Sequence, residues 1–233
     1  MSILNKITSL EQQLLSITNQ LKTLKLQVKG DTPKPKGLLN RLHLFDFETT
    51  GLGKTKHIRI CELGVVKYSN HQTKLQHYVN PTVGVSSSAQ KVHGLKREFL
   101  ETFNTWEKVG KKLNGYVLSE GTVLLGGFNS KRYDSRILFF EHLRHGLELP
   151  NRLSFIDFRD VFKEIFPNVT TPKTLNAYYH NVTGEDIPDA HTAVGDCLAI
   201  AKILESVTDT TTLEQSMIKH KESVSSLTKR CLK

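Results

Sequence analysis

The sequence predicts a three-layer α/β domain with a mixed central sheet, preceded by an N-terminal coiled-coil helix. From residue 38 to residue 208, short apolar segments typical of strands alternate with amphipathic segments typical of helices. Residues 1–29 carry an unbroken heptad pattern of apolar residues. Residues 30–37 contain two prolines and two glycines, which favours an extended linker between the two parts.

The N-terminal helix is predicted by its period. Apolar residues alternate at spacings of four and three along the whole segment: Ile3, Ile7, Leu10, Leu14, Ile17, Leu21, Leu24 and Val28. Because a strict period of about 3.5 residues is that of a coiled-coil seam, we expect a homo-oligomer formed through residues 3–28. Isoleucine and leucine are mixed at both core positions, so the number of associating helices stays open. The alternative is an amphipathic helix that packs against its own domain.

The compact domain is expected to begin near Leu38. Five apolar segments predict strands: Arg41–Phe47, Arg59–Lys67, Lys74–Val79, Thr122–Gly126 and Phe155–Asp157. Five segments with helical periodicity predict helices: Ser87–Gly94, Thr105–Tyr116, Arg132–His145, Thr174–His180 and Thr192–Val207. Residues 209–233 are polar and contain several lysines, which favours a loosely ordered C-terminal tail.

Composition narrows the class of partner and compartment. The net charge of +9 favours a polyanionic partner, either nucleic acid or an anionic membrane surface. The three cysteines form no C-x-x-C pair, which argues against a disulfide framework or a cysteine zinc site and favours a reducing compartment. No apolar run approaches the ~18 residues of a membrane span, and the first residues lack a signal-peptide pattern. We therefore expect an intracellular protein of the nucleus and/or cytoplasm with no membrane partner.

Two carboxylates stand two residues apart in the first predicted strand. Alternate residues of a strand point to the same side, so Asp46 and Glu48 are expected to lie together. The flanking apolar residues predict a buried strand, where like charges repel and burial raises their cost. Bound divalent cations remove this penalty, because Mg²⁺ and Mn²⁺ prefer carboxylate oxygens. The alternative is a strand edge whose acids are merely solvated.

Two further short motifs carry acidic and histidine side chains. Asp134 follows a predicted strand and opens a helix, where an aspartate also serves as a cap or a partner of the helix dipole. His191 and Asp196 stand at the start of the last predicted helix, among small residues that let other segments approach. Each of these motifs alone also fits an ordinary helix start.

In combination and in order, these segments resemble the DEDDh branch of the DnaQ-like exonuclease superfamily. Its three motifs are D-x-E, a mid-chain aspartate in an N-x-x-x-[YF]-D setting, and H-x-A-x-x-D. The resemblance covers residues 40–206, and within the branch the chain is similar to the three-prime repair exonucleases of animals. The matching stretches are Phe45–Leu52, Ile60–Leu63, Val92–Leu95, Asn129–Asp134 and Asp189–Asp196.

The resemblance implies a ribonuclease-H-like fold and a 3′-to-5′ exonuclease that hydrolyses phosphodiester bonds and releases nucleoside 5′-monophosphates. It also implies Mg²⁺ as the cofactor, with two ions per site and Mn²⁺ as a substitute. The metal ligands would be Asp46, Glu48, Asp134 and Asp196. His191 would be the general base, because an imidazole can take a proton near neutral pH. The alternative for His191 is a structural histidine next to the metal.

The same resemblance assigns substrate contacts to eight residues: Thr49, Thr50, Leu52, His93, Leu95, Asn129, Arg132 and Tyr133. Leu52 would wedge against the terminal base, and the backbone around Thr49 and Thr50 would meet the sugar. Nearby basic residues could meet phosphates, although surface charges often have no specific partner. The chain departs from the family at Phe128, because Gly-Phe-Asn replaces the usual Ala-His-Asn and removes a polar side chain near the site.

The substrate class is left open by the motifs. We favour the 3′ ends of single-stranded DNA as the partner. An RNA 3′-to-5′ exonuclease is the alternative, because nothing in the motifs reads the 2′-hydroxyl. A second alternative is a catalytically silent nucleic-acid-binding module assembled by its coiled coil, which the presence of all five catalytic residues disfavours.

Overall fold

The computed structural model describes residues 37–169 and 174–233. The predicted coiled-coil helix and nearly all of the predicted linker lie outside these residues. Within them, a mixed sheet of six strands has the order β3-β2-β1-β4-β5-β6. Its strands are β1 (Leu42–Thr49), β2 (Ile60–Lys67), β3 (Lys74–Tyr78), β4 (Val123–Gly127), β5 (Leu153–Asp157) and β6 (Glu222–Ser223).

The centre of the sheet is β1, which lies between an antiparallel and a parallel neighbour. It pairs with β2 in antiparallel and with β4 in parallel orientation. Beyond them, β3 is antiparallel to β2, β5 is parallel to β4, and β6 is antiparallel to β5. A central strand is covered on both faces, so any polar side chain that it carries is partly shielded from water.

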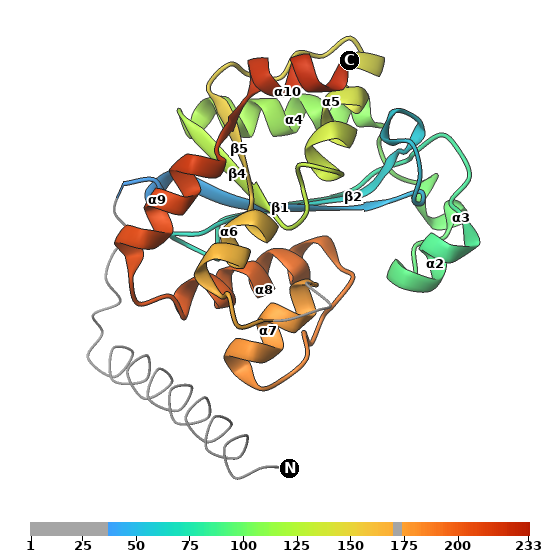
Figure 1. The fold of residues 1–233 in the computed structure, drawn as a ribbon. Helices are drawn as coiled ribbons and strands as arrows, with labels where there is room; N and C mark the ends of the chain where they lie inside the picture. Colours follow the sequence, from blue (N-terminus) through green and yellow to red (C-terminus); the bar gives the residue numbers. More distant parts are fainter. Residues whose placement is uncertain (1–36, 170–173) are drawn as a thin grey trace.

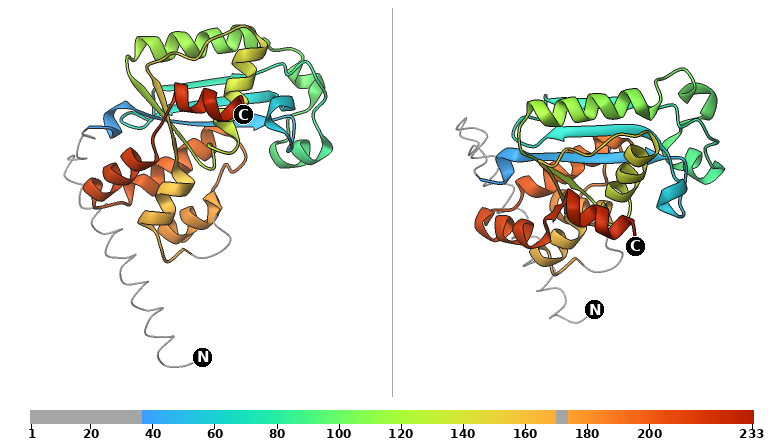
Figure 2. Two further views of the ribbon diagram at one scale, coloured as in Figure 1. Left: turned by 45° about the horizontal axis from the view of Figure 1, so that its top comes forward. Right: turned by 90° about the horizontal axis from the view of Figure 1, so that it is seen from above.

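Helices cover both faces of the sheet, as Figures 1 and 2 show. One face carries α4 (Trp106–Ser119), α5 (Asp134–Arg144) and α10 (Val224–Cys231). The other carries α6 (Phe158–Ile165), α7 (Leu175–Thr183), α8 (Ala193–Glu205) and α9 (Thr210–His220). Beside one end of the sheet lie α2 (Ser87–His93) and α3 (Arg97–Leu100), and two short 3-10 turns are η1 (Leu39–Arg41) and η2 (Thr55–His57).

The core is divided between the two faces of the sheet by the alternation of β1. Phe45 and Phe47 pack into the cluster under α4 and α5, whereas Leu42 and Leu44 pack into the cluster under α6 to α9. Asp46 and Glu48 follow Leu42 and Leu44 in the same two-residue period, so they belong to the α8 face. Contacts of α8 with both β1 and β2 agree with this placement.

The five predicted strands and five predicted helices are confirmed, with bounds that shift by three residues or fewer. Two helices in this part of the chain were not predicted, the short α3 and α6, and α6 begins directly where β5 ends. The carboxylate of Asp157 accepts the backbone N–H of Arg159 at 2.9 Å and so caps this helix without an intervening loop. No helix within the described ranges is long and apolar enough to cross a membrane.

The expectation of a loosely ordered tail over residues 209–233 was wrong. This segment forms α9, the short strand β6 and α10. Its composition is polar, but its few apolar residues are spaced by four and fall on one helical face each, with Leu213 and Met217 in α9 and Leu227 and Cys231 in α10. All four are buried in the two main clusters.

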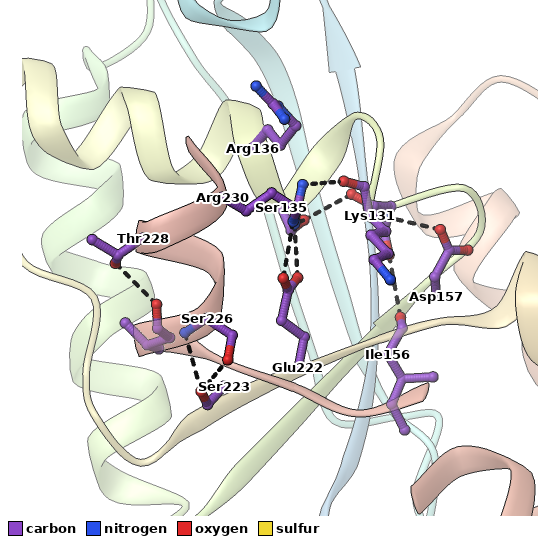
Figure 3. Close-up of polar contacts among 12 residues, drawn as sticks. Lys131, Ser135, Arg136, Ile156, Asp157, Glu222, Ser223, Ser226, Thr228 and Arg230 are labelled. Atoms are coloured by element: carbon purple, nitrogen blue, oxygen red, sulfur yellow. Dashed lines mark hydrogen bonds and ion pairs between the residues drawn. The ribbon is translucent and has the colours of Figure 1, made fainter. Parts of the chain in front are cut away.

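Arg230, which is paired with Glu222, fastens the C-terminal segment to the turn before α5 by hydrogen bonds (Figure 3). Glu222 accepts from Arg230 Nε at 2.9 Å and from Nη2 at 2.7 Å. The same guanidinium donates to the carbonyl of Lys131 at 2.6 Å and to the hydroxyl of Ser135 at 3.3 Å. Both partners of the ion pair are mostly buried, so the pair is screened less than a surface pair.

Replacing Arg230 by glutamine should therefore destabilise the fold. Arg230→Gln leaves the carboxylate of Glu222 without its cation, which should lower the free energy of unfolding by about 1–3 kcal/mol in urea denaturation. The matched control is Lys111→Gln, because Lys111 pairs with Glu107 where both side chains are more than half exposed. That change should cost less than about 0.5 kcal/mol. Equal losses in the two variants would contradict the assigned role.

Candidate active site

The carboxyl-terminal half of β1 carries two acidic side chains into the middle of the fold. Asp46 and Glu48 alternate with Phe45 and Phe47, whose rings fill the opposite face of the sheet. Glu48 is only 7% exposed. The strand thus supplies two neighbouring carboxylates at a place where water screens them poorly.

The third carboxylate comes from the first turn of α8. Thr192 caps this helix, since its hydroxyl accepts the backbone N–H of Gly195 at 3.1 Å. Gly64 of β2 lets the helix start approach the sheet, because a Cβ there would stand 2.6 Å from the carbonyl carbon of Ala193. Asp196 is thereby brought to the end of β1.

The result is a cluster of three carboxylates. One oxygen each from Asp46, Glu48 and Asp196 lies within 4.8 Å of the other two. Oxygen-only donor sets of this kind suit a hard divalent cation such as Mg²⁺, Mn²⁺ or Ca²⁺. The three residues therefore fit a divalent metal, and all three were predicted as metal ligands from the sequence.

The fourth predicted ligand, Asp134, lies beside this cluster as the first residue of α5. It is 8% exposed. Burial raises the pKa of Asp46 most, and the charge of Asp134 is the next largest cause. The structure thus brings all four predicted acids together, three of them in the tight cluster.

These acids hold their protons unusually strongly. Burial, and then the charge of Asp134, holds the pKa of Asp46 well above its ordinary value. Burial, and then the charge of Asp196, raises the pKa of Glu48 to about 8. Burial is also the main cause that raises the pKa of Asp134 to about 7. Without a cation, the folded protein favours partial protonation of the cluster, and a bound cation would replace those protons.

His191 stands at the solvent side of this cluster. It is exposed and has a backbone φ of +65°, in the left-handed region, just before the cap of α8. Burial raises the pKa of Asp196, while the imidazole and the backbone of His191 lower it. The histidine predicted to be the general base is therefore close to Asp196 and open to water.

Of the predicted substrate residues, four hold the end of β1 and α2 in place. The backbone N–H of Leu95 donates to His93 Nδ1 at 3.0 Å, so the neutral ring donates from Nε2 to the carbonyl of Thr49, also at 3.0 Å. The hydroxyl of Thr50 accepts the backbone N–H of Arg59. The backbone N–H of Thr50 donates to the carbonyl of Arg59, and the carbonyl of Thr50 accepts the backbone N–H of Ser86. Thr50, which is 8% exposed, thus serves first to anchor the loop after β1.

Leu52 behaves differently from these anchored neighbours. It is 85% exposed, between two glycines whose φ of +153° is unfavourable for other residues. Its side chain is open to solvent, and the contact of Leu52 with a base stays a prediction.

The remaining three predicted substrate residues lie in the turn between β4 and α5. Asn129 has a φ of +57°, and its Oδ1 accepts from Arg159 Nη1 at 3.1 Å. Arg132 is exposed and Tyr133 is half-buried directly before Asp134. Phe128, the departure from the family pattern, has its ring 5.9 Å from that of Tyr178, so it packs against the core.

Glu62 was missed as a site residue. It faces Glu48 across β1 and β2 and is 2% exposed. It accepts from Gln76 Nε2 at 2.8 Å and from the backbone N–H of Ala193 at 3.4 Å, at the start of α8. Its charge also raises the pKa values of both β1 acids. The available signal was a single carboxylate inside the apolar strand Ile60–Lys67.

Comparison with known proteins agrees with this arrangement. Residues 44–204 match the model of a family described as exonuclease (RNase T). Exonuclease DPD1, chloroplastic/mitochondrial, of Arabidopsis thaliana is 29% identical over 209 residues. That match covers 80% of this chain and 59% of the plant protein, so the chain spans less than two thirds of that relative.

Several solved structures share the fold. The nuclease domain of 3′hExo, a DEDDh family member bound to rAMP, matches with a TM-score of 0.60 and 20% identity, over 76% of this chain and 92% of its own. A 3′-exonuclease that recognises the histone mRNA stem-loop matches with a TM-score of 0.62 and 19% identity, over 90% and 78%. Exonuclease I of E. coli with a dT13 oligonucleotide matches with 0.64 and 17%, over 77% and 43%.

The raised pKa values predict how pH and cations act on stability. Groups whose pKa is raised by folding bind protons more tightly in the folded chain, so their contribution to stability falls as pH rises from about 4 to about 8. Without cations, Asp46→Asn should therefore be more stable than the wild type at about pH 8, and this advantage should shrink towards about pH 5.5. Thermal denaturation of the two proteins at each pH, in the presence of a chelator, measures this difference in stability.

Denaturation curves recorded with added cation in place of the chelator test cation binding. At about pH 8, Mg²⁺ or Mn²⁺ at about 100 times its Kd should stabilise the wild type by about 2.7 kcal/mol. Asp46→Asn should lose most of this gain. Equal stabilisation of the two proteins would mean that the cation binds elsewhere.

A methyl group at Gly64 should disturb the acidic cluster by displacing the helix that carries Asp196. Gly64→Ala places a Cβ against the backbone of Ala193, which should push the start of α8 away, weaken cation stabilisation and cost about 1–3 kcal/mol of stability. Gly115→Ala is the matched control, because nothing lies within 4 Å of a Cβ there. In α4 that change should be neutral or stabilise by about 0.5–1 kcal/mol. Unchanged cation binding in Gly64→Ala would refute the need for close approach.

Proposed function

Because the chain belongs to the exonuclease family that matches residues 44–204, we propose that it is a 3′-to-5′ exonuclease that releases nucleoside 5′-monophosphates. Family membership makes it a nuclease hydrolase of the DnaQ-like superfamily, and its mixed sheet with surrounding helices is a ribonuclease-H-like exonuclease fold. To this the proposal adds the 3′-to-5′ direction of digestion, the release of nucleoside 5′-monophosphates and catalysis by two divalent ions. The observation that carries it is the carboxylate cluster of Asp46, Glu48 and Asp196 with Asp134 beside it.

The proposed mechanism assigns each side chain a separate task. The four carboxylates would hold two divalent ions, Mg²⁺ with Mn²⁺ as a substitute, which supply positive charge to the scissile phosphate and activate water. His191 would accept the proton of the attacking water, which its exposed position next to Asp196 allows. Leu52 would stack against the terminal base, and the anchored loop around Thr50 would keep that contact in register.

Single-stranded DNA is the substrate that we favour, and RNA is the second candidate. One structure that shares the fold is a complex with the oligonucleotide dT13, and another is of an enzyme that recognises the histone mRNA stem-loop. The described site offers no feature that selects against a 2′-hydroxyl. We further propose, from sequence alone, that residues 3–28 join copies of the chain and that it works in the nucleus and/or cytoplasm.

The test is digestion of a 5′-labelled DNA oligonucleotide and its RNA equivalent with Mg²⁺. Products should shorten from the 3′ end, and their relative rates rank the two substrates. Asp46→Asn should lower kcat by more than about 100-fold, since loss of outer partners of a metal already costs up to about that factor. Glu107→Gln is the control, because that carboxylate is exposed on α4.

Two outcomes would count against the proposal. Release of the 5′ label as a mononucleotide, without a series of shorter labelled products, would mean digestion from the 5′ end and would overturn the polarity. No degradation of either substrate, with Mn²⁺ also supplied, would favour the catalytically silent binding module.

A further inference from the structure

The loop between β1 and β2 carries the exposed Leu52 at its tip. The base of this loop is anchored, because Ile58 is buried in the core. Gly51 and Gly53 flank Leu52, and glycine leaves the backbone more freedom than any other residue. The position of the tip therefore depends on contacts that it receives from elsewhere in the fold.

Those contacts come from α5. Among the described residues, the hydrogen bonds that tie residues 52–57 to another helix or strand are both donated by this helix. Arg136 Nε donates to the hydroxyl of Thr55 at 3.3 Å, and Arg144 Nη2 donates to the carbonyl of Lys56 at 2.8 Å. The loop is thus held by the first turn and by the last residue of α5.

A buried carboxylate orients Arg144 for its contact with the loop. Glu141, one turn earlier in α5, is 1% exposed and pairs with Arg144 Nη1 at 2.9 Å. Its other oxygen accepts the backbone N–H of Ile60 at 3.3 Å, at the start of β2. One guanidinium therefore bridges a carboxylate and the carbonyl of Lys56, and such charge-assisted bonds are stronger than neutral ones. We call Glu141 and Arg144 the loop clamp.

An ordinary stabilising ion pair is the alternative for the loop clamp. Burial of a carboxylate is costly, and a buried ion pair seldom stabilises a fold more than apolar side chains of the same size. The property that apolar side chains lack is direction, because only hydrogen-bond donors can hold the carbonyl of Lys56 at a fixed place. A need for fixed geometry therefore explains this pair better than a need for stability.

Helix α5 links the loop clamp to the acidic cluster. Asp134 is the first residue of this helix and Arg144 is the last, so about 15 Å of helix separates them. Because the helix is held together by its own hydrogen bonds, it moves as a unit over this length. A shift of the loop against α5 therefore changes the distance between Leu52 and Asp134.

We propose that the loop clamp is a positioning pair, which fixes Leu52 relative to Asp134 and so holds the terminal base in line with the acidic cluster. The proposal rests on the proposed exonuclease function and on its contact between Leu52 and a base. Glu141 and Arg144 then serve the reaction without touching the substrate or the cations. Misplacement of reacting groups by about 1 Å can lower a rate about 100-fold, so a small movement of the loop is enough.

Two variants loosen the loop clamp to different degrees. Glu141→Gln, Arg144→Gln removes the ion pair without leaving a buried charge, and the amide oxygen can still accept the N–H of Ile60. Arg144→Lys is milder, because it keeps the positive charge but not the planar fork that reaches both partners. The control is Glu107→Gln, Lys111→Gln, which removes an exposed pair of the same charges on α4.

Hydrogen exchange measures whether the clamp holds the loop. Two backbone bonds of η2, from His57 to Lys54 and from Ile58 to Thr55, protect amides of the loop. These amides should exchange faster in both clamp variants than in the wild type or the control. Amides of α8 should keep their wild-type rates, which separates a loosened loop from a general loss of stability.

A double-mutant cycle with Leu52→Ala tests the positioning role. Leu52→Ala and the double clamp variant should each lower kcat/KM on a 5′-labelled oligonucleotide by about 10-fold to about 100-fold. Once Leu52 is truncated, loss of the clamp should lower kcat/KM by no more than about 2-fold further, whereas independent sites would multiply their losses. Arg144→Lys should show the same pattern with smaller losses.

The fluorescence of a 3′-terminal 2-aminopurine reports the position of the base without hydrolysis. Stacking on the neighbouring base quenches its emission, so in the Asp46→Asn protein the emission should rise when Leu52 separates the two bases. Leu52→Ala and both clamp variants should reduce this rise, and the control should not. If the wild type hydrolyses no substrate, the exonuclease proposal fails, while the emission still tests the loop clamp.

Three outcomes would overturn the positioning role. In the first, loop exchange and emission in the double clamp variant match those of the control. In the second, the combined loss of kcat/KM equals the product of the two separate losses, as it would for a purely structural ion pair. In the third, Leu52→Ala is as active as the wild type, so the clamp has no side chain of the loop to act through.

Discussion

The rest of this structure depends on the confinement of like charges. Asp46, Glu48 and Asp196 are held within 4.8 Å of one another towards the carboxyl end of the central strand, where their partial burial leaves their repulsion poorly screened by water. Two features of the fold hold the three acids together despite this repulsion. A central strand aligns two of the acids, and the close approach of α8 at Gly64 delivers the third. A divalent cation is the partner that turns this repulsion into attraction.

Much of this arrangement could be predicted from short-range patterns. Strand and helix periodicity located the elements, and the spacing of Asp46 and Glu48 placed two acids on one face. Glu62 escaped notice because its partners, Gln76 and the start of α8, are distant in the sequence. The role of His93 as a tie between α2 and β1 escaped for the same reason, since a hydrogen bond across 44 residues leaves no local signature.

The C-terminal segment shows a different limit of sequence reasoning. Polar composition suggests disorder when a segment cannot bury enough apolar surface by itself. Residues 209–233 need bury only four apolar side chains, because two cores already exist to receive them. β6 and the Arg230 ion pair then add contacts that depend on the finished sheet. Order in such a segment is a property of the whole fold and not of its own composition.

The bond from Arg230 to the carbonyl of Lys131 joins residues 99 positions apart. Contacts of such high sequence separation form late, after the intervening elements have been placed. During synthesis, the turn that carries Asp134 thus emerges long before its brace. The order of synthesis therefore sets a delay between making the acids of this site and bracing the turn that presents one of them, which lasts at least until α10 has been made.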